Sequence, residues 1–231
     1  MKKLGILGGI GPESTLEYYK RIIYGYRKII NDGNYPQVFI NSINMTEMLN
    51  FVANNDDKNL INFLCDEIKK LEMLGADFIA LASNTPHCVI DELINKSAVP
   101  IISIVEETCK YAKNNNLKKI LLTGTIFTMK RDFYKKSLEK NNIECIVPND
   151  TEKDTIQNII FPNLENGIIV EKDKDTFKAT CNKIIKEKNI DGIILGCTEL
   201  PLMINKSDFD ICVIDTMDIH IKSIVEKITG T

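Results

Sequence analysis

The sequence has no tryptophan, three arginines and only two histidines, His87 and His220, among its 231 residues. Its seven cysteines include no Cys-x-x-Cys pair, so the sequence lacks the closely spaced ligands of a zinc site and the paired cysteines of a disulfide framework. Arginine is the usual side chain for holding a carboxylate, and its scarcity limits how an acidic ligand can be bound. Most cysteines lie in apolar segments and are expected to be core residues in a reducing compartment: Cys65, Cys109, Cys145, Cys181 and Cys212.

The chain also lacks a strong charge of either sign. Its formal charge of -3 and pI near 5.6 argue against a nucleic acid or an anionic membrane as partner. No apolar run approaches the roughly 20 residues of a membrane-spanning helix. The N-terminal segment starts with lysines, but its glycines and Pro12 end the apolar run too early for a signal peptide. We therefore expect a globular cytoplasmic protein that binds a small molecule.

The stretch from Asp191 to Pro201 predicts a buried strand that ends at Gly196 and is followed by Cys197 and Thr198. An unbroken apolar run is typical of a strand buried on both faces, and Pro201 suits the first turn of a helix. Open α/β sheets bind their ligands beyond the carboxyl ends of their strands. Cys197 is thus expected at a ligand site, beside a helix start that favours its thiolate.

The same pattern occurs earlier, between Asp77 and His87. Asp77 matches Asp191 at the start of the pattern, and Ser83 matches Cys197 after the strand. The segment 118–125 likewise echoes the segment 2–9. These matches indicate a duplicated unit, with one candidate proton-transfer residue in each copy.

Strands and helices alternate along the chain, which predicts an α/β fold with parallel sheets and right-handed crossovers. We expect two pseudo-symmetric, doubly wound lobes with an active-site cleft between them, the first formed by 1–98 plus 207–231 and the second by 99–206. Residues 44–56 give no clear pattern, and Thr85 is expected to cap a helix that starts at Pro86. Strands are predicted at 3–8, 37–43, 77–82, 100–104, 118–125, 143–147, 191–196 and 210–214, and helices at 12–30, 57–74, 86–96, about 105–114, 129–141, 152–166, 172–188 and 217–228.

Two facing lobes would bring Ser83 and Cys197 to opposite sides of one ligand. Two proton-transfer groups on opposite faces of a carbon are what stereo-inversion needs. No cofactor site is apparent, because the glycines at 8–11 lack the spacing of a dinucleotide loop. Their backbone N–H groups at a helix start suit a carboxylate, or less convincingly a phosphate. A carbanion would then be stabilised by desolvation and by backbone N–H groups that point toward it.

Five motifs in order through nearly the whole chain resemble those of the aspartate/glutamate racemase family. They are Gly5-Ile-Leu-Gly-Gly-Ile-Gly-Pro-Glu-Ser-Thr15, Asn84-Thr-x-His87, Gly124-Thr-x-x-Thr-Met129 with Asp132-Phe-Tyr134, Gly196-Cys-Thr-Glu199 and Asp215-Thr-x-x-Ile-His220. The resemblance implies a cofactor-independent, two-base racemase, usually a homodimer, with a two-lobed α/β fold. It implies that the carboxylate and ammonium of an amino acid are held by loops containing Gly9, Ile10, Asn84, Thr85, Thr125, Thr198 and Glu199.

Two departures from the family pattern bear on chemistry and substrate. The first cysteine of the family falls on Ser83, a much weaker acid that cannot be held ready as a base. In the family the second-lobe cysteine, here Cys197, faces the Cα hydrogen of the L-enantiomer. The arginine run that grips an acidic side chain is replaced by Asn44-Met-Thr-Glu47, and a lysine that joins it falls on Asn163. The sequence therefore supports racemase chemistry more strongly than it supports an acidic substrate.

Several alternatives remain open at this stage. Ser83 could only cap the next helix, and Cys88 could stand in for the missing thiol, although burial fits Cys88 better. His87 and His220 are expected to make supporting hydrogen bonds. The chain could also be a lyase that decarboxylates malonates with a single cysteine, or an amino-acid-binding protein without activity.

Overall fold

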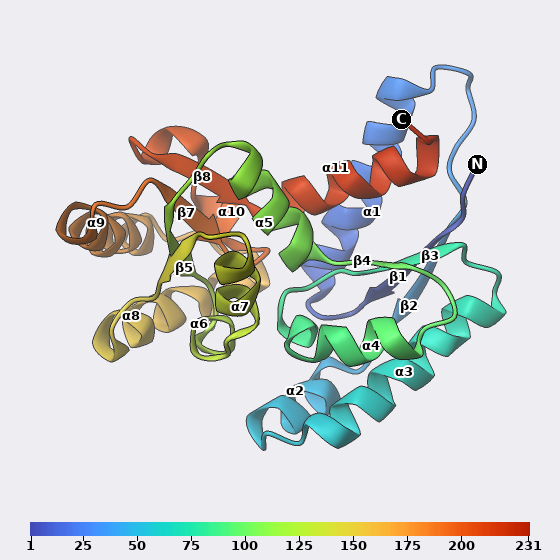
Figure 1. Ribbon diagram of the computed structural model, residues 1–231, viewed down its shortest axis with the longest axis horizontal. Helices are drawn as coiled ribbons and strands as arrows, with labels where there is room; N and C mark the ends of the chain where they lie inside the picture. The colour runs from blue at the N-terminus through green and yellow to red at the C-terminus, as the bar shows by residue number, and fades with distance from the viewer. The chain divides into compact units, whose positions relative to one another are not determined.

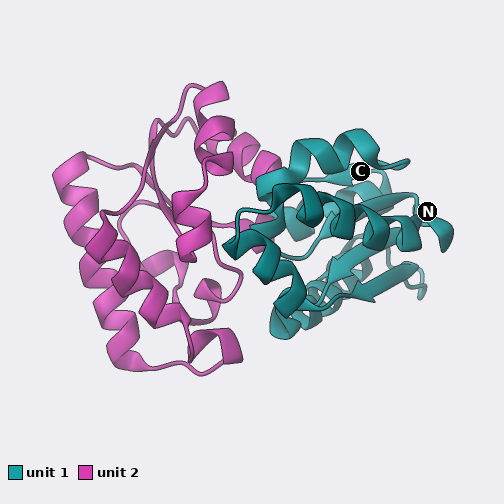
Figure 2. Cartoon of the chain, turned by 90° about the horizontal axis from the view of Figure 1, so that it is seen from below, with its two compact units in different colours: residues 1–104, 220–231 teal, residues 105–219 magenta.

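The structure is a computed structural model that describes residues 1–231, and the chain divides into two compact units (Figures 1 and 2). Unit 1 comprises Met1–Ile104 and His220–Thr231, so it holds both termini, and unit 2 comprises Val105–Ile219. The sequence placed all of 207–231 in the first lobe. The structure gives residues 207–219 to unit 2, because the strand within them pairs with the strand that precedes Cys197.

Unit 1 contains a parallel sheet whose strands lie in the order β2-β1-β3-β4. Every residue of β1 and β3 is buried, as their unbroken apolar runs predict. Helices α1 and α11 lie on one face of the sheet and α3 and α4 on the other (Figure 1). The elements are β1 (Leu4–Gly8), α1 (Pro12–Ile29), β2 (Val38–Ser42), α2 (Met45–Ala53), α3 (Asp57–Met73), β3 (Phe78–Leu81), η1 (a 3₁₀ helix, Thr85–Val89), α4 (Ile90–Lys96), β4 (Ile101–Ile102) and α11 (Thr216–Thr229).

Unit 2 repeats this plan in a second parallel sheet, in the order β6-β5-β7-β8. Its core is formed by α8, α9 and the buried residues of β5 and β7, with Leu121, Phe177 and Ile193 among its members. The elements are α5 (Ile104–Asn114), β5 (Lys119–Thr123), α6 (Ile126–Lys130), α7 (Phe133–Lys140), β6 (Glu144–Ile146), α8 (Asp150–Ile160), η2 (Leu164–Asn166), α9 (Glu171–Lys188), β7 (Gly192–Leu195), α10 (Leu200–Met203), η3 (Lys206–Asp208) and β8 (Cys212–Asp215).

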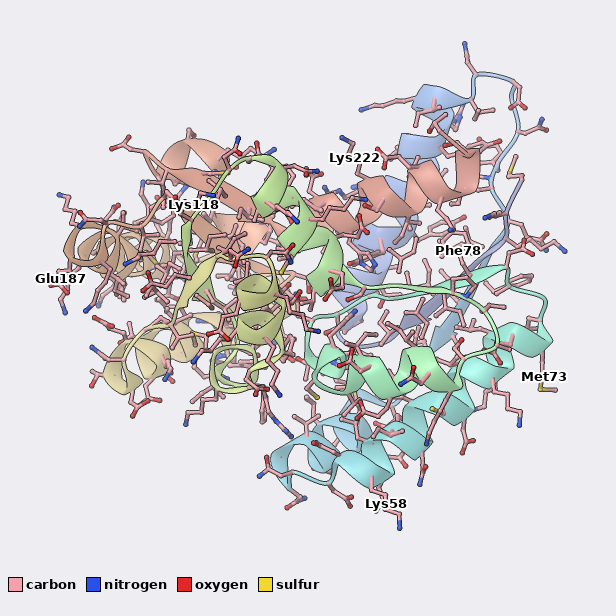
Figure 3. All side chains as sticks on the ribbon, in the orientation of Figure 1. Lys58, Met73, Phe78, Lys118, Glu187 and Lys222 are labelled. Carbon is pink, nitrogen blue, oxygen red and sulfur yellow. The ribbon has the colours of Figure 1, made fainter.

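The two aspartates that open the repeated sequence pattern have the same local task. Asp77, one residue before β3, accepts a hydrogen bond from the backbone N–H of Lys3 at 2.6 Å. Asp191, one residue before β7, accepts hydrogen bonds from the N–H groups of Lys118 and Lys119 at 2.8 and 3.0 Å. Lys118 is labelled in Figure 3, just before β5. Each carboxylate thus joins the amino ends of two neighbouring strands, as expected for a duplicated unit.

Several local predictions are corrected by the structure. The unclear stretch 44–56 contains α2, capped by Asn44, whose side-chain oxygen accepts from the N–H groups of Thr46 and Glu47. Thr85 does not cap a helix with its side chain, because the chain first makes the 3₁₀ turn η1 before α4 begins at Ile90. The helix expected at 129–141 is two helices, α6 and α7, and that expected at 152–166 stops at Ile160, just before Pro162.

No helix has the length and apolarity needed to cross a membrane. The longest helices, α1 and α9, are amphipathic and carry charged residues on one face.

Candidate functional site

Cys197 lies just beyond β7, at the carboxyl edge of the unit 2 sheet, where the sequence placed it. Its side chain is buried, and its thiol donates a hydrogen bond to Oε2 of Glu199 at 2.9 Å. The hydroxyl of Thr198 donates to the same oxygen at 3.0 Å. Three consecutive residues therefore form one buried polar group, in which the Glu199 carboxylate accepts two hydrogen bonds.

The structure contradicts the expectation that a helix start favours the Cys197 thiolate. Burial and the neighbouring Glu199 carboxylate raise the pKa of the Cys197 thiol well above its ordinary value. The following helix, α10, has only four residues, so its dipole is too small to offset a carboxylate in direct contact. In the ligand-free protein Cys197 is therefore a thiol, which is alkylated more slowly than a thiolate.

Two glycines let the Cys197 loop lie directly against the loop that carries Thr125. The N–H of Gly196 donates to the carbonyl of Thr123 at 2.8 Å, and a Cβ on Gly196 would lie 2.5 Å from that oxygen. A Cβ on Gly124 would lie 2.8 Å from the carbonyl oxygen of Gly196. Only glycine fits at either position, so the backbone itself fixes the spacing between Thr125 and Cys197.

Thr125 caps α6, because its side chain accepts a hydrogen bond from the N–H of Thr128. The N–H of Ile126 is occupied by Oε1 of Gln157 at 2.7 Å. A ligand carboxylate near this loop therefore cannot use the amides of Ile126 or Thr128 without displacing a partner.

Glu165 is an addition that the sequence analysis missed. It lies in η2, and burial and the charge of Glu199 raise the pKa of its carboxyl group. Glu165 also contributes to the raised pKa of Cys197. Because it lies thirty-odd residues before Cys197 in an irregular loop, no spacing in the sequence connects it to the site.

In unit 1 the loop after β1 has a tight turn at Gly9, where φ is 82° and a Cβ would lie 2.6 Å from the carbonyl oxygen of Ile43. The Gly9 N–H, expected to be available to a ligand, donates to Oγ1 of Thr15 at 2.8 Å. That expectation is wrong for Gly9, because a threonine one turn into α1 satisfies its amide. Ile10 is buried beside it.

Ser83 and Asn84 are buried immediately beyond β3, and Thr85 begins η1. The N–H of Ala82 donates to the carbonyl of Leu7 at 2.9 Å, and the hydroxyl of Ser14 donates to the carbonyl of Ala82 at 2.9 Å. These bonds attach the Ser83 loop to β1 and to the first turn of α1. Ser83 thus occupies in unit 1 the place that Cys197 occupies in unit 2.

Each unit therefore gathers its own predicted residues at the carboxyl edge of its sheet. Unit 1 presents Gly9, Ile10, Ser83, Asn84 and Thr85, and unit 2 presents Thr125, Cys197, Thr198 and Glu199. The unit 2 group can pass a proton between a thiol and a carboxylate. The unit 1 group offers a hydroxyl and an amide side chain, which can donate hydrogen bonds to an anion.

The remaining cysteines agree with the prediction of core or packing roles to different degrees. Cys109 and Cys181 are fully buried, while Cys65, Cys145 and Cys212 are partly exposed. Burial raises the pKa of both Cys109 and Cys145 to about 12. None of these thiols has a carboxylate within hydrogen-bonding distance as Cys197 has. Cys88 is also partly exposed, so the expectation that it is buried is wrong.

Comparison with known proteins points to one family. A family model described as Asp/Glu/Hydantoin racemase matches residues 7–224. A broad specificity amino-acid racemase from Bacillus subtilis is 29% identical over 225 residues, which cover 96% of this chain and 96% of that protein.

Two solved structures share both the fold and about a third of the residues. A putative Asp/Glu racemase from Yersinia pestis has a TM-score of 0.91 and 31% identity, covering 99% of this chain and 100% of that one. An aspartate racemase homologue from Pyrococcus horikoshii has a TM-score of 0.86 and 39% identity, with the same coverage.

Proposed function

Because the chain belongs to the Asp/Glu/Hydantoin racemase family, we propose that it is a cofactor-independent amino-acid racemase with Cys197 as base and Ser83 on the opposite face of the substrate. The observation that carries the proposal is the Cys197 thiol, buried at the end of a parallel strand and hydrogen-bonded to Glu199. A buried thiol beside a carboxylate is unfavourable for stability alone, and it supplies a proton acceptor for chemistry.

Glu199 makes Cys197 a base in this proposal. The thiol first gives its proton to the Glu199 carboxylate along the hydrogen bond between them, leaving a thiolate. The thiolate then takes the Cα proton of the L-amino acid, which leaves a carbanion and restores the thiol. Ser83, directly or through a water molecule, gives a proton to the far face and recovers one from solvent. Glu199 releases its proton to solvent, because Cys197 already holds the proton from Cα, so no protons are gained or lost over the cycle.

Aspartate or glutamate is the proposed substrate, because the family and the solved relatives are named for them. A broader range that includes neutral amino acids is the second candidate. It is favoured by the broad specificity of the relative that matches almost the whole chain, and by Asn44-Met-Thr-Glu47 at the place of the arginine run. Arg131, at the end of α6, is the cation proposed to replace that run.

A panel of single enantiomers, incubated with the protein and separated by chiral chromatography, tests this proposal. We expect the opposite enantiomer to form from aspartate or glutamate. Comparable rates for aspartate, asparagine and an uncharged amino acid would favour the broad range. Carbon dioxide release from a disubstituted malonate would identify a one-cysteine decarboxylase instead, and binding without turnover an inactive binding protein.

Glu199→Gln is expected to separate two roles of this carboxylate. Without its charge the pKa of Cys197 falls, so alkylation by iodoacetamide at pH 8 becomes faster. Without an acceptor for the thiol proton, racemisation at pH 7 falls by about a hundredfold or more. The control is Glu165→Gln, which removes a second charge that raises the pKa of Cys197 but keeps Glu199 as the acceptor of the thiol proton, so we expect no comparable loss of racemisation. Racemisation that rises together with alkylation would contradict the proposed proton transfer.

Ser83→Cys is expected to speed the D-to-L direction by at least about tenfold, because a cysteine thiol ionises far more readily than a serine hydroxyl near neutral pH and so makes a base available. In the natural protein only Cys197 can readily deprotonate substrate, so Cα deuterium uptake from the D-form should be the slower of the two. The overall equilibrium constant is unchanged, so the asymmetry appears in initial rates. Equal initial rates from both enantiomers in the natural protein would show that Ser83 or another group is a competent base.

A further inference from the structure

Both histidines of the chain are fully buried in unit 1, and both bind the backbone of the segment 102–104. His220 Nε2 lies 2.9 Å from the carbonyl oxygen of Ile102, and the N–H of Ile104 donates to Nε2 of His87 at 3.3 Å. These contacts are the supporting hydrogen bonds predicted for both residues.

The partners fix the proton on each ring. A carbonyl oxygen only accepts, so Nε2 of His220 carries the hydrogen. Because burial lowers the pKa of His220 to about 4, its Nδ1 is bare at neutral pH and accepts from the hydroxyl of Tyr18 at 2.8 Å. An amide N–H only donates, so Nε2 of His87 is bare and its Nδ1 carries the hydrogen. That Nδ1 is buried and has no hydrogen-bond partner. Both rings are therefore neutral, each in a defined tautomer.

These contacts lie at the places where the chain passes between its units. Ile104 is the last residue of the first part of unit 1, and His220 is the residue at which the chain returns to unit 1. His87 lies four positions after Ser83, and its own N–H donates to the carbonyl of Asn84 at 3.0 Å. We call the passage at Ile104 the first crossover and the passage at His220 the second crossover. The His87 side chain joins the Ser83 loop to the first crossover, and the His220 side chain joins the second crossover to the first.

We propose that Tyr18, His87 and His220 are positioning residues that hold both crossover segments and the Ser83–Asn84 loop together as one piece of unit 1. The two hydrogen bonds that link Tyr18, His220 and Ile102 fix the second crossover, and the hydrogen bond from Ile104 to His87 fixes the first. The task of the Ser83 loop rests on the proposed function, whereas the mechanical coupling does not.

The chemistry of the surroundings supports this role. The groups that face the rings are the Tyr18 hydroxyl from α1, the other histidine and the backbone carbonyls of Ser83, Asn84 and Ile102, and no charged side chain contributes to the pKa of either ring. A buried imidazole without a charged partner adds less to stability than an apolar side chain of its size. Its specific contribution here is the direction of its hydrogen bonds.

Amide hydrogen exchange, followed by NMR at Ile104 and at residues 83–85 and 219–221, tests the proposal without needing activity. Tyr18→Phe removes the hydroxyl that holds His220, and we expect exchange at 102–104 and 219–221 to become at least about tenfold faster. The matched control is Tyr26→Phe, on the same helix, since the Tyr26 hydroxyl is equally buried but has no hydrogen-bond partner. Equal protection in the two variants would overturn the proposal.

A second pair of variants tests His87. His87→Met keeps the bulk but offers no good acceptor to the Ile104 N–H, whereas the side-chain oxygen of His87→Gln can accept at the place of Nε2. We expect Ile104 exchange to rise at least about tenfold in His87→Met, to spread to residues 83–85, and to return near the natural value in His87→Gln. Faster exchange confined to Ile104, or none, would overturn the coupling to the Ser83 loop. If His87→Met does not fold, the tyrosine pair decides the outcome.

Discussion

Cys197→Ala is expected to abolish Cα proton exchange from either enantiomer, with a loss of at least about a thousandfold. The loss is large because Cys197 is the base toward the L-form and the proton donor in the reverse direction. The Cys197 thiol is buried and donates a hydrogen bond to the Glu199 carboxylate. Proton exchange into Cα is followed by NMR in heavy water, and the fold by circular dichroism.

Two further cysteine variants make this result specific. Cys181→Ala removes an equally buried thiol from α9 of the same unit, and we expect lower stability with nearly normal exchange. Cys88→Ala tests the residue considered as a substitute for the missing first cysteine. Substantial exchange in Cys197→Ala, combined with its loss in Cys88→Ala, would move the base to unit 1 and contradict the proposed mechanism.

Acidification from pH 7 to pH 5 is expected to destabilise unit 1 by about 4 kcal/mol. Burial, with a smaller effect of the nearby His220, lowers the pKa of His87 to about 3, and burial lowers the pKa of His220 to about 4. In the unfolded chain both titrate near 6.5, so below that pH the unfolded state binds more protons and gains stability. Each histidine accounts for about 2 kcal/mol of the loss at pH 5, against a typical total stability of about 5–15 kcal/mol.

Urea unfolding at pH 7.5, 6 and 5 measures this dependence. Replacing one histidine, as in His87→Gln, should reduce the slope of stability against pH by about one proton below pH 6. Asp208, whose pKa is lowered to about 2 by Lys178, loses its contribution to stability only below about pH 4. It therefore does not affect the change in stability between pH 7.5 and pH 5. Glu165, with a raised pKa, acts in the opposite direction at the acid end. Stability that stays constant between pH 7.5 and pH 5 would contradict buried neutral histidines.

The parallel sheets were predictable because their central strands are buried on both faces and therefore have unbroken apolar sequences. Unbroken apolar runs such as Ile193-Ile-Leu195 have no polar face to present to water. The aspartates Asp77 and Asp191 mark equivalent strand starts, and each accepts from the backbone N–H of an equivalent lysine, Lys3 for Asp77 and Lys119 for Asp191. The sequence offset therefore predicts that Ser83 and Cys197 lie at equivalent sheet edges.

What the sequence could not supply was which groups contact one another, at short as well as at long separations along the chain. Whether Cys197 is a thiol depends on the rotamer that brings Glu199 to its sulfur and on Glu165 from another loop. The Gly9 amide is taken by Thr15, one turn into the next helix, which no motif states. The partners of His87 and His220 are the backbone groups of Ile102 and Ile104 and the distant hydroxyl of Tyr18, and no motif in the sequence states these contacts.

The most direct test of the account is the fate of the Cα proton of L-aspartate in heavy water. The natural protein should replace that proton with deuterium and form D-aspartate, and it should act more slowly on the D-form as starting material. L-glutamate and an uncharged amino acid, measured in parallel, define the range of substrates. Cα signals that stay unchanged for all of them, in the presence of a folded protein, would contradict racemase function for this chain.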